Sequence, residues 1–275
     1  MLVKLMKYEF RASARLFLPA YCIFAALLVI ERISILGVTL LENTPLETAR
    51  QISEMSMFLL TLLVVLALFA LFACPMVFAA LRFYRNTVTD EGYLTFTLPV
   101  KAGQVILSKL FVSVIWQIAT AIFAALFGFL FFLTIDPPET LSVLRQLLEE
   151  LFSLFRDTPQ FPIYLMEGIL TVPVQAACGV LQAYCAISIG QLSNRHKLLS
   201  AIGIYIGMGI AASILSQMIT LPALFTFASS QSSVISAFFD SFLLSMTLAL
   251  LVQAGLAVMY FFLCRYFLEK KLNLA

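Results

Sequence analysis

Six long apolar runs, separated by shorter polar stretches, dominate the sequence of 275 residues. A helix needs about 20 mostly apolar residues to cross the hydrocarbon core of a bilayer, and each run meets that length. The runs are rich in leucine, alanine and phenylalanine, which favours helices, because a membrane barrel would show short alternating strands instead. The predicted spans are 16–40, 57–81, 110–135, 163–192, 198–221 and 242–267.

The composition agrees with an all-α integral membrane protein. Hydrophobic residues make up 62% of the chain and charged residues 12%, whereas about 25% of a soluble domain is charged. The mean hydropathy is +1.01. The net charge of +2 is too small to indicate a nucleic-acid partner, so the partner that composition predicts is the lipid bilayer.

The basic residues predict the side of the membrane on which each connection lies, because lysine and arginine accumulate in cytoplasmic loops. With six spans, thirteen of the 17 basic residues fall on one side. Eleven of the 15 acidic residues fall on the other side. Both termini are therefore predicted to be cytoplasmic, in a single transmembrane domain over residues 1–275.

Three segments outside the spans have patterns of their own. Residues 1–15 form a predicted basic amphipathic helix at the cytoplasmic membrane surface, and their charges are unlike a cleavable signal peptide. The outer connection 136–162 has leucines at helical spacing over 141–155, which predicts a surface helix. Residues 222–240, between spans five and six, carry no charge before Asp240, which predicts a re-entrant segment.

The sequence contains no catalytic constellation. There is no G-x-x-x-x-G-K-[ST] motif, so the chain is not predicted to use ATP through a P-loop of its own. The single histidine, His196, lies in a predicted cytoplasmic loop, whereas a zinc site of the HExxH type needs two. The five cysteines lack metal-ligand or disulfide spacing. We therefore expect no enzyme activity, no catalytic residue, no metal and no cofactor in this chain.

Polar side chains inside the spans are costly, so they are candidates either for a transport pathway or for hydrogen bonds between helices. The candidate pathway-lining residues are Gln117, Gln175, Gln182 and Gln253, with Gln217 as a further intramembrane amide. Gly203 and Gly207 form a small-residue face that would let another helix approach closely. No aspartate, glutamate or lysine lies near the middle of a span, which disfavours an ion-coupled carrier.

The cytoplasmic connection 82–109 contains a polar, turn-rich stretch, DEGYLTFTLPVKAGQVILSK, over residues 90–109. Its leading acids, Asp90 and Glu91, suit the N-terminus of a short helix, and Pro99 would end that helix. The helix would present the apolar side chains of Tyr93, Leu94 and Phe96. A short helix held between two spans can fit a cleft in a partner protein and transmit the partner's movement.

This stretch resembles the coupling element of ABC exporter permeases of the type-2 class. After their second span, these permeases carry an acidic-Gly element, an L-x-x-P-V-like step and a hydrophobic pair before a lysine. The matching residues here are Asp90, Glu91, Gly92, Leu98, Pro99, Val100, Ile106, Leu107 and Lys109. The layout of six spans is also similar to that family, and the stretch SIGQLSNRHKLLSAIG resembles small uncharacterised permeases from Gram-positive bacteria.

The resemblance implies a permease subunit of an ATP-driven exporter in the bacterial plasma membrane, paired with a second copy or a similar permease. A cytoplasmic ABC ATPase subunit, carrying the ATP and magnesium, would dock on a coupling helix at about 88–98. The implied coupling residues are Asp90, Glu91, Gly92, Tyr93, Leu94, Phe96, Leu98 and Pro99. The few charges in the spans favour an amphipathic or hydrophobic substrate such as a peptide, lipid or drug.

Two other function classes stay open on the sequence alone. One is an ion-coupled secondary transporter or channel, and the other is a non-transporting membrane sensor.

Overall fold

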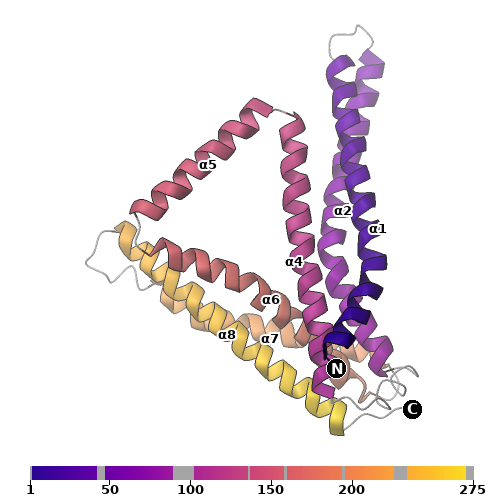
Figure 1. Ribbon diagram of the computed structural model, residues 1–275, viewed down its shortest axis with the longest axis vertical. Coiled ribbons are helices and arrows are strands. Elements are labelled where there is room, and N and C mark those ends of the chain that lie inside the picture. The colour runs from indigo at the N-terminus through magenta and orange to yellow at the C-terminus, as the bar shows by residue number, and fades with distance from the viewer. Residues whose placement is uncertain are drawn as a thin grey trace. The chain divides into compact units, whose positions relative to one another are not determined.

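The computed structural model is almost entirely helical in the part of the chain that it describes. The described residues are 2–41, 47–88, 102–135, 137–157, 160–193, 196–225 and 234–270. They form α1 (Leu2–Leu41), α2 (Glu47–Val88), α4 (Ala102–Ile135), α5 (Pro137–Asp157), α6 (Phe161–Gly190), α7 (Lys197–Phe225) and α8 (Val234–Lys270) (Figure 1). All of these helices except α5 are long and apolar enough to cross a membrane. The prediction of an all-α protein with six helices long and apolar enough to span a membrane is confirmed.

Helix α1 differs in one respect from the sequence-based expectation. Residues 1–15 are predicted as a helix separate from the first span, but the structure has one continuous helix of 40 residues from Leu2 to Leu41. No glycine or proline lies between Leu2 and Leu18, so nothing in the sequence ends the helix before the span begins.

One predicted segment is described only in part, and another is described completely. Helix α7 continues to Phe225 and α8 begins at Val234, so the centre of the predicted re-entrant segment 222–240 lies outside the described residues. Its re-entrant path therefore stays a prediction, as does the cytoplasmic location of both termini. The predicted helix at 141–155 is present as α5, which begins four residues earlier and ends two residues later than predicted.

The chain divides into two compact units. Unit 1 contains Met1–Lys7, Met76–Ile115 and Thr158–Ala275, and unit 2 contains Tyr8–Pro75 and Trp116–Asp157. Helix α2 passes from unit 2 into unit 1 directly after Pro75, where a proline removes one backbone hydrogen bond of the helix.

In unit 1, helices α6, α7 and α8 lie side by side (Figure 1). The end of α2 and the beginning of α4 contribute to the same core, because Phe83 and Ile106 have no exposed surface. Phe83 stacks on Tyr184 of α6, with ring centroids 4.1 Å apart. This core therefore ties the two helix ends that flank residues 89–101 to the bundle of α6, α7 and α8.

Helices α6 and α7 meet closely where α6 ends. A Cβ atom on Gly190 would lie 2.7 Å from the Cα of Ala201, so only a glycine fits there without a shift of the backbone. The Ser200 hydroxyl donates a hydrogen bond of 2.8 Å to the Gly190 carbonyl. These contacts explain why α6 stops two residues before the end of the predicted span 163–192.

In unit 2, aromatic side chains join α1 to α4. The Trp116 ring lies 4.6 Å from the Phe17 ring and 5.0 Å from the Phe10 ring, measured between centroids. The hydroxyls of Tyr21 and Thr120 share a hydrogen bond of 2.7 Å. Aromatic pairs of this kind contribute about 0.5–1.5 kcal/mol beyond the area that they bury, so this cluster stabilises the pairing of the two helices.

Candidate functional site

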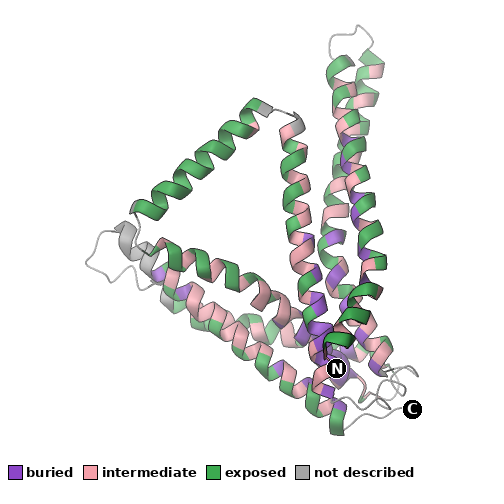
Figure 2. Cartoon of the chain, viewed as in Figure 1, coloured by how far each residue is buried: buried purple, intermediate pink, exposed green. Residues whose placement is uncertain are grey.

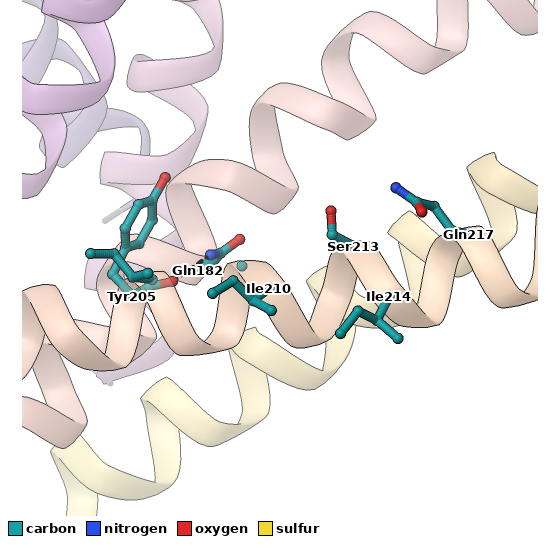
Figure 3. Close-up of a pocket in the computed structure, with 8 residues that line it drawn as sticks. Gln182, Tyr205, Ile210, Ser213, Ile214 and Gln217 are labelled. Carbon is teal, nitrogen blue, oxygen red and sulfur yellow. Dashed lines mark hydrogen bonds between the residues drawn. The ribbon is translucent and has the colours of Figure 1, made fainter.

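A groove with a volume of about 530 Å³ runs along α7 in unit 1 (Figure 3). We call it the polar groove, because amide and hydroxyl groups alternate in it with isoleucines. Its lining residues are Gln182 of α6 and Tyr205, Ile206, Gly209, Ile210, Ser213, Ile214 and Gln217 of α7.

Gln182 is held at the groove by a backbone contact across the two helices. Its Nε2 donates a hydrogen bond of 3.0 Å to the carbonyl of Tyr205. A Cβ atom on Gly209 would lie 3.1 Å from the same nitrogen, so the glycine leaves room for the amide against α7. Gln182 thus serves as a hydrogen-bond link between helices and keeps its carbonyl oxygen for another donor.

Ser213 and Gln217 lie on the same side of α7 (Figure 3). Both residues are exposed. Polar side chains inside membrane spans usually face a protein interior or a water-filled cavity rather than lipid. If α7 spans a bilayer, we therefore expect water, a ligand or another protein to contact this side of the helix.

Gly203 and Gly207 lie on the exposed surface of α7 as well. A Cβ atom on either would meet no atom within 4 Å. The close approach of α6 to α7 occurs at Gly209 and Gly190 instead. The packing role predicted for Gly203 and Gly207 stays a prediction, because no described residue packs closely against them.

An apolar pocket of about 450 Å³ adjoins the polar groove. Alanines contribute much of its lining and leave the space open. Its lining residues are Met76, Val77, Ala80, Leu81 and Tyr84 of α2, Ala183, Ala186 and Ile187 of α6, and Leu198, Ala201, Ile202 and Tyr205 of α7. Because Tyr205 lines both spaces, a polar and an apolar surface meet at one residue.

The other candidate amides do not join Gln182 in the groove. Gln175 is exposed on α6. The Oε1 of Gln253 on α8 is buried and has no hydrogen-bond partner among the described residues. The same holds for the Nε2 of Gln117, which belongs to unit 2. These two buried amides are left with hydrogen-bonding capacity for water or a ligand.

Gln217 and Ser213 were not assigned to the site from the sequence, although a signal was present. Tyr205, Gly209, Ser213 and Gln217 follow one another at intervals of four residues. That spacing places them along one slowly turning side of a helix, and it could have indicated a polar stripe on the fifth span.

The predicted coupling residues 90–99 lie outside the described residues. The last part of the same motif is described, and it belongs to the core of unit 1. Ile106 is fully buried, Leu107 packs against the core cluster, and Lys109 is 5% exposed. Ile106 and Lys109 are therefore buried at the start of α4, and Leu107 is half-buried against the same core.

Among the described residues, no group of three or more histidine, cysteine, aspartate or glutamate side chains could hold a metal ion. Comparisons of the chain with protein-family models, with curated proteins and with solved structures give no match. The features that bear on function are therefore the polar groove, the apolar pocket and the connection 82–109 after the second predicted span, which we call the second connection.

Proposed function

We propose that this protein is the transmembrane permease subunit of an ABC exporter in the bacterial plasma membrane. A separate cytoplasmic ATPase would supply the energy, and a second copy or a similar permease would complete the pathway. Six helices long and apolar enough to cross a membrane support this proposal. The sequence over residues 90–109 also supports it, because two acidic residues, two aromatic residues and a proline follow one another there.

The observation that carries the proposal is the packing of the two helix ends beside that stretch. Phe83 lies five residues before the end of α2, and Ile106 lies four residues after the start of α4. Both side chains are fully buried in one core with Tyr184 of α6. Because packed interiors are stiff, a displacement of residues 89–101 would move α6 along with α2 and α4.

That movement would reach the polar groove over a short distance. Tyr184, which receives the Phe83 ring, lies two residues after Gln182 on α6. Gln182 in turn bonds to the backbone of α7. An ATPase that displaces the second connection would therefore change the position of α6 relative to α7, and the candidate substrate surface lies on these two helices.

The neighbouring polar and apolar surfaces favour an amphipathic substrate. Amides and hydroxyls of the polar groove would bind its polar part, and the alanine-lined pocket would take its apolar part. A peptide, a lipid or an amphipathic drug has this character, whereas an inorganic ion would find no charged ligand among the groove residues.

The exposed side of α7 supports pairing with a second permease. Ser213 and Gln217 are poorly suited to lipid, and Gly203 and Gly207 leave space for a close helix contact. A partner span against this side would cover the amide and hydroxyl and would turn the groove into a pathway between two subunits.

Affinity purification from the native membrane tests the proposal. The tagged chain is extracted in mild detergent with and without prior crosslinking, and the co-purifying proteins are identified by mass spectrometry. We expect a P-loop ATPase in stoichiometric amount, absent when an unrelated tagged six-span protein is purified in the same way. No ATPase after crosslinking would contradict the proposal and would favour a carrier or a sensor.

A further inference from the structure

Helix α5 is divided lengthwise into an apolar and a charged half. At about 100° per residue, nine large apolar side chains fall within one half of the helix circumference. They are Leu141, Val143, Leu144, Leu147, Leu148, Leu151, Phe152, Leu154 and Phe155. The opposite half carries all the charges, which are Glu139, Arg145, Glu149, Glu150, Arg156 and Asp157.

The apolar half of α5 is exposed along its length in the described part of the chain. Every residue from 141 to 156 is exposed (Figure 2). The N-terminal half of α5 approaches α4: the Thr140 hydroxyl donates a hydrogen bond of 3.0 Å to the Phe132 carbonyl, and residues up to Leu147 line an open pocket with α4. Leaving so large an apolar surface in water would be costly, at about 25 cal/mol per Å², so something must cover it.

The short connections on both sides restrict where α5 can lie. A single residue separates Ile135 of α4 from Pro137, and three residues separate Asp157 from Phe161 of α6. A residue spans at most about 3.6 Å, whereas a helix of 21 residues is about 32 Å long. Each end of α5 is therefore tied closely to the end of a predicted span.

Those two span ends emerge at the same membrane surface, because they belong to consecutive spans. The sequence stays apolar up to the end of α4, FFLTI, and from the start of α6, FPIYLM, so both ends lie at the lipid. An upright α5 would lift one of its ends about 32 Å from the membrane, which the short connections forbid. Its axis must run along the surface.

We propose that α5 lies in the headgroup layer of this membrane surface and binds phospholipid with its apolar half. Arg145 and Arg156 both lie at one border of the apolar half, where long basic side chains can reach lipid phosphates. Arg145 also pairs with Glu149 at 2.8 Å on the charged half. The inference depends on α4 and α6 being spans, and not on the proposed transport function.

The charge of α5 defines how it binds. Four carboxylates outnumber two guanidinium groups on the helix, so attraction to anionic lipids does not hold it in place. Burial of apolar side chains supplies the binding free energy instead. The binding of α5 should consequently be insensitive to the fraction of anionic lipid, unlike that of a basic amphipathic helix.

Tryptophan fluorescence of the full chain in vesicles tests this placement. The single native tryptophan is first removed by Trp116→Phe, so that the only fluorescent indole is the introduced one. Phenylalanine keeps an aromatic ring beside Phe10 and Phe17. Leu151→Trp then places the probe on the apolar half, and Ser153→Trp places it on the charged half of the same helix turn. The vesicles contain phosphatidylcholine with brominated acyl chains, or ordinary phosphatidylcholine with iodide on both sides.

We expect brominated lipid to quench the Leu151→Trp variant at least about threefold more than the Ser153→Trp variant, and iodide to show the reverse order. Replacing a quarter of the lipid by phosphatidylglycerol should leave these ratios unchanged. Leu148→Trp and Gln146→Trp form a second pair if either variant of the first fails to reconstitute.

Three results would overturn the inference. Equal quenching of both probes by brominated lipid would mean that α5 does not present one half to the bilayer. A Leu151→Trp probe shielded from both lipid and iodide would mean that a second copy or another protein covers the apolar half. A strong increase in quenching with phosphatidylglycerol would mean that charge, and not apolar burial, positions the helix.

Discussion

The ring of Phe83 lies flat against the ring of Tyr184, with centroids 4.1 Å apart and planes inclined by 12°. Phe83 has no exposed surface and Tyr184 is 1% exposed. The pair joins the last turns of α2 to the C-terminal part of α6. It connects the helix that leads into residues 89–101 with the helix that contributes Gln182 to the polar groove.

Replacing Phe83 with alanine should destabilise unit 1 strongly. Removing a fully buried phenylalanine side chain leaves a cavity and costs about 3–5 kcal/mol. The matched control is Phe69→Ala on the same helix, because Phe69 is 72% exposed and its removal leaves no cavity. Thermal unfolding of the purified variants in the same detergent measures the difference. Similar unfolding temperatures for the two variants would show that the Phe83 contact is not part of a packed core.

The sequence was sufficient for the spans but not for the site. Hydropathy reports how long and how apolar a segment is, so all six helices and α5 could be predicted. It does not report which residues of two helices meet. Gln175 and Gln182 share one side of α6, yet only Gln182 reaches α7, because the contact of Gly190 with Ala201 sets the register of the two helices. That register is a tertiary property.

The register of the helices also decides which glycines lie in a close helix contact, and the sequence does not report it. Gly203 and Gly207 have the spacing that is typical of close helix contacts, whereas Gly209 and Gly190 are the glycines that make one within the chain. A spacing of four residues shows that a small-residue face exists. It does not show whether the chain itself or a second molecule lies against that face.

Gly190→Ala should destabilise the pairing of α6 with α7. The added methyl group would lie 2.7 Å from the Cα of Ala201, which is backbone and cannot move aside alone. Overpacking of this kind costs about 1–3 kcal/mol. Gly255→Ala is the control, because its methyl group would meet no atom within 4 Å and alanine favours a helix by up to about 1 kcal/mol. A Gly190→Ala protein as stable as wild type in thermal unfolding would disprove the close contact.

A double-mutant cycle tests the hydrogen bond between Gln182 and the Tyr205 carbonyl. Gly209→Ala would push a methyl group to 3.1 Å from the Gln182 amide nitrogen and weaken the bond. We expect a loss of about 0.6 kcal/mol, the average for a hydrogen bond between membrane helices. In the Gln182→Ala background the same substitution should be neutral or stabilising. Additive effects on the free energy of unfolding would mean that the two residues are not coupled.

Gly207→Leu tests the proposed pairing of two copies of the chain through α7. The leucine side chain points into open space in the single chain, so its thermal stability should not fall. It would block a close approach of a second helix, so self-association measured by energy transfer between labelled copies in vesicles should drop about tenfold. Gly255→Leu, also without a neighbour within 4 Å, should leave self-association unchanged. Equal association of the two variants would exclude this side of α7 as the contact.

Leu94→Asp and Tyr93→Asp test the docking of an ATPase on the second connection. If these side chains enter an apolar cleft of the partner, a buried unpaired carboxylate would cost several kcal/mol and the ATPase should no longer co-purify. Thr95→Asp is the matched control, since it adds the same charge to the same stretch at a residue that is not among the predicted coupling residues. If these residues serve to contact a partner, the thermal stability of the chain itself should be equal in all three variants. Retention of the ATPase by the Leu94→Asp and Tyr93→Asp proteins would place the docking surface elsewhere on the chain.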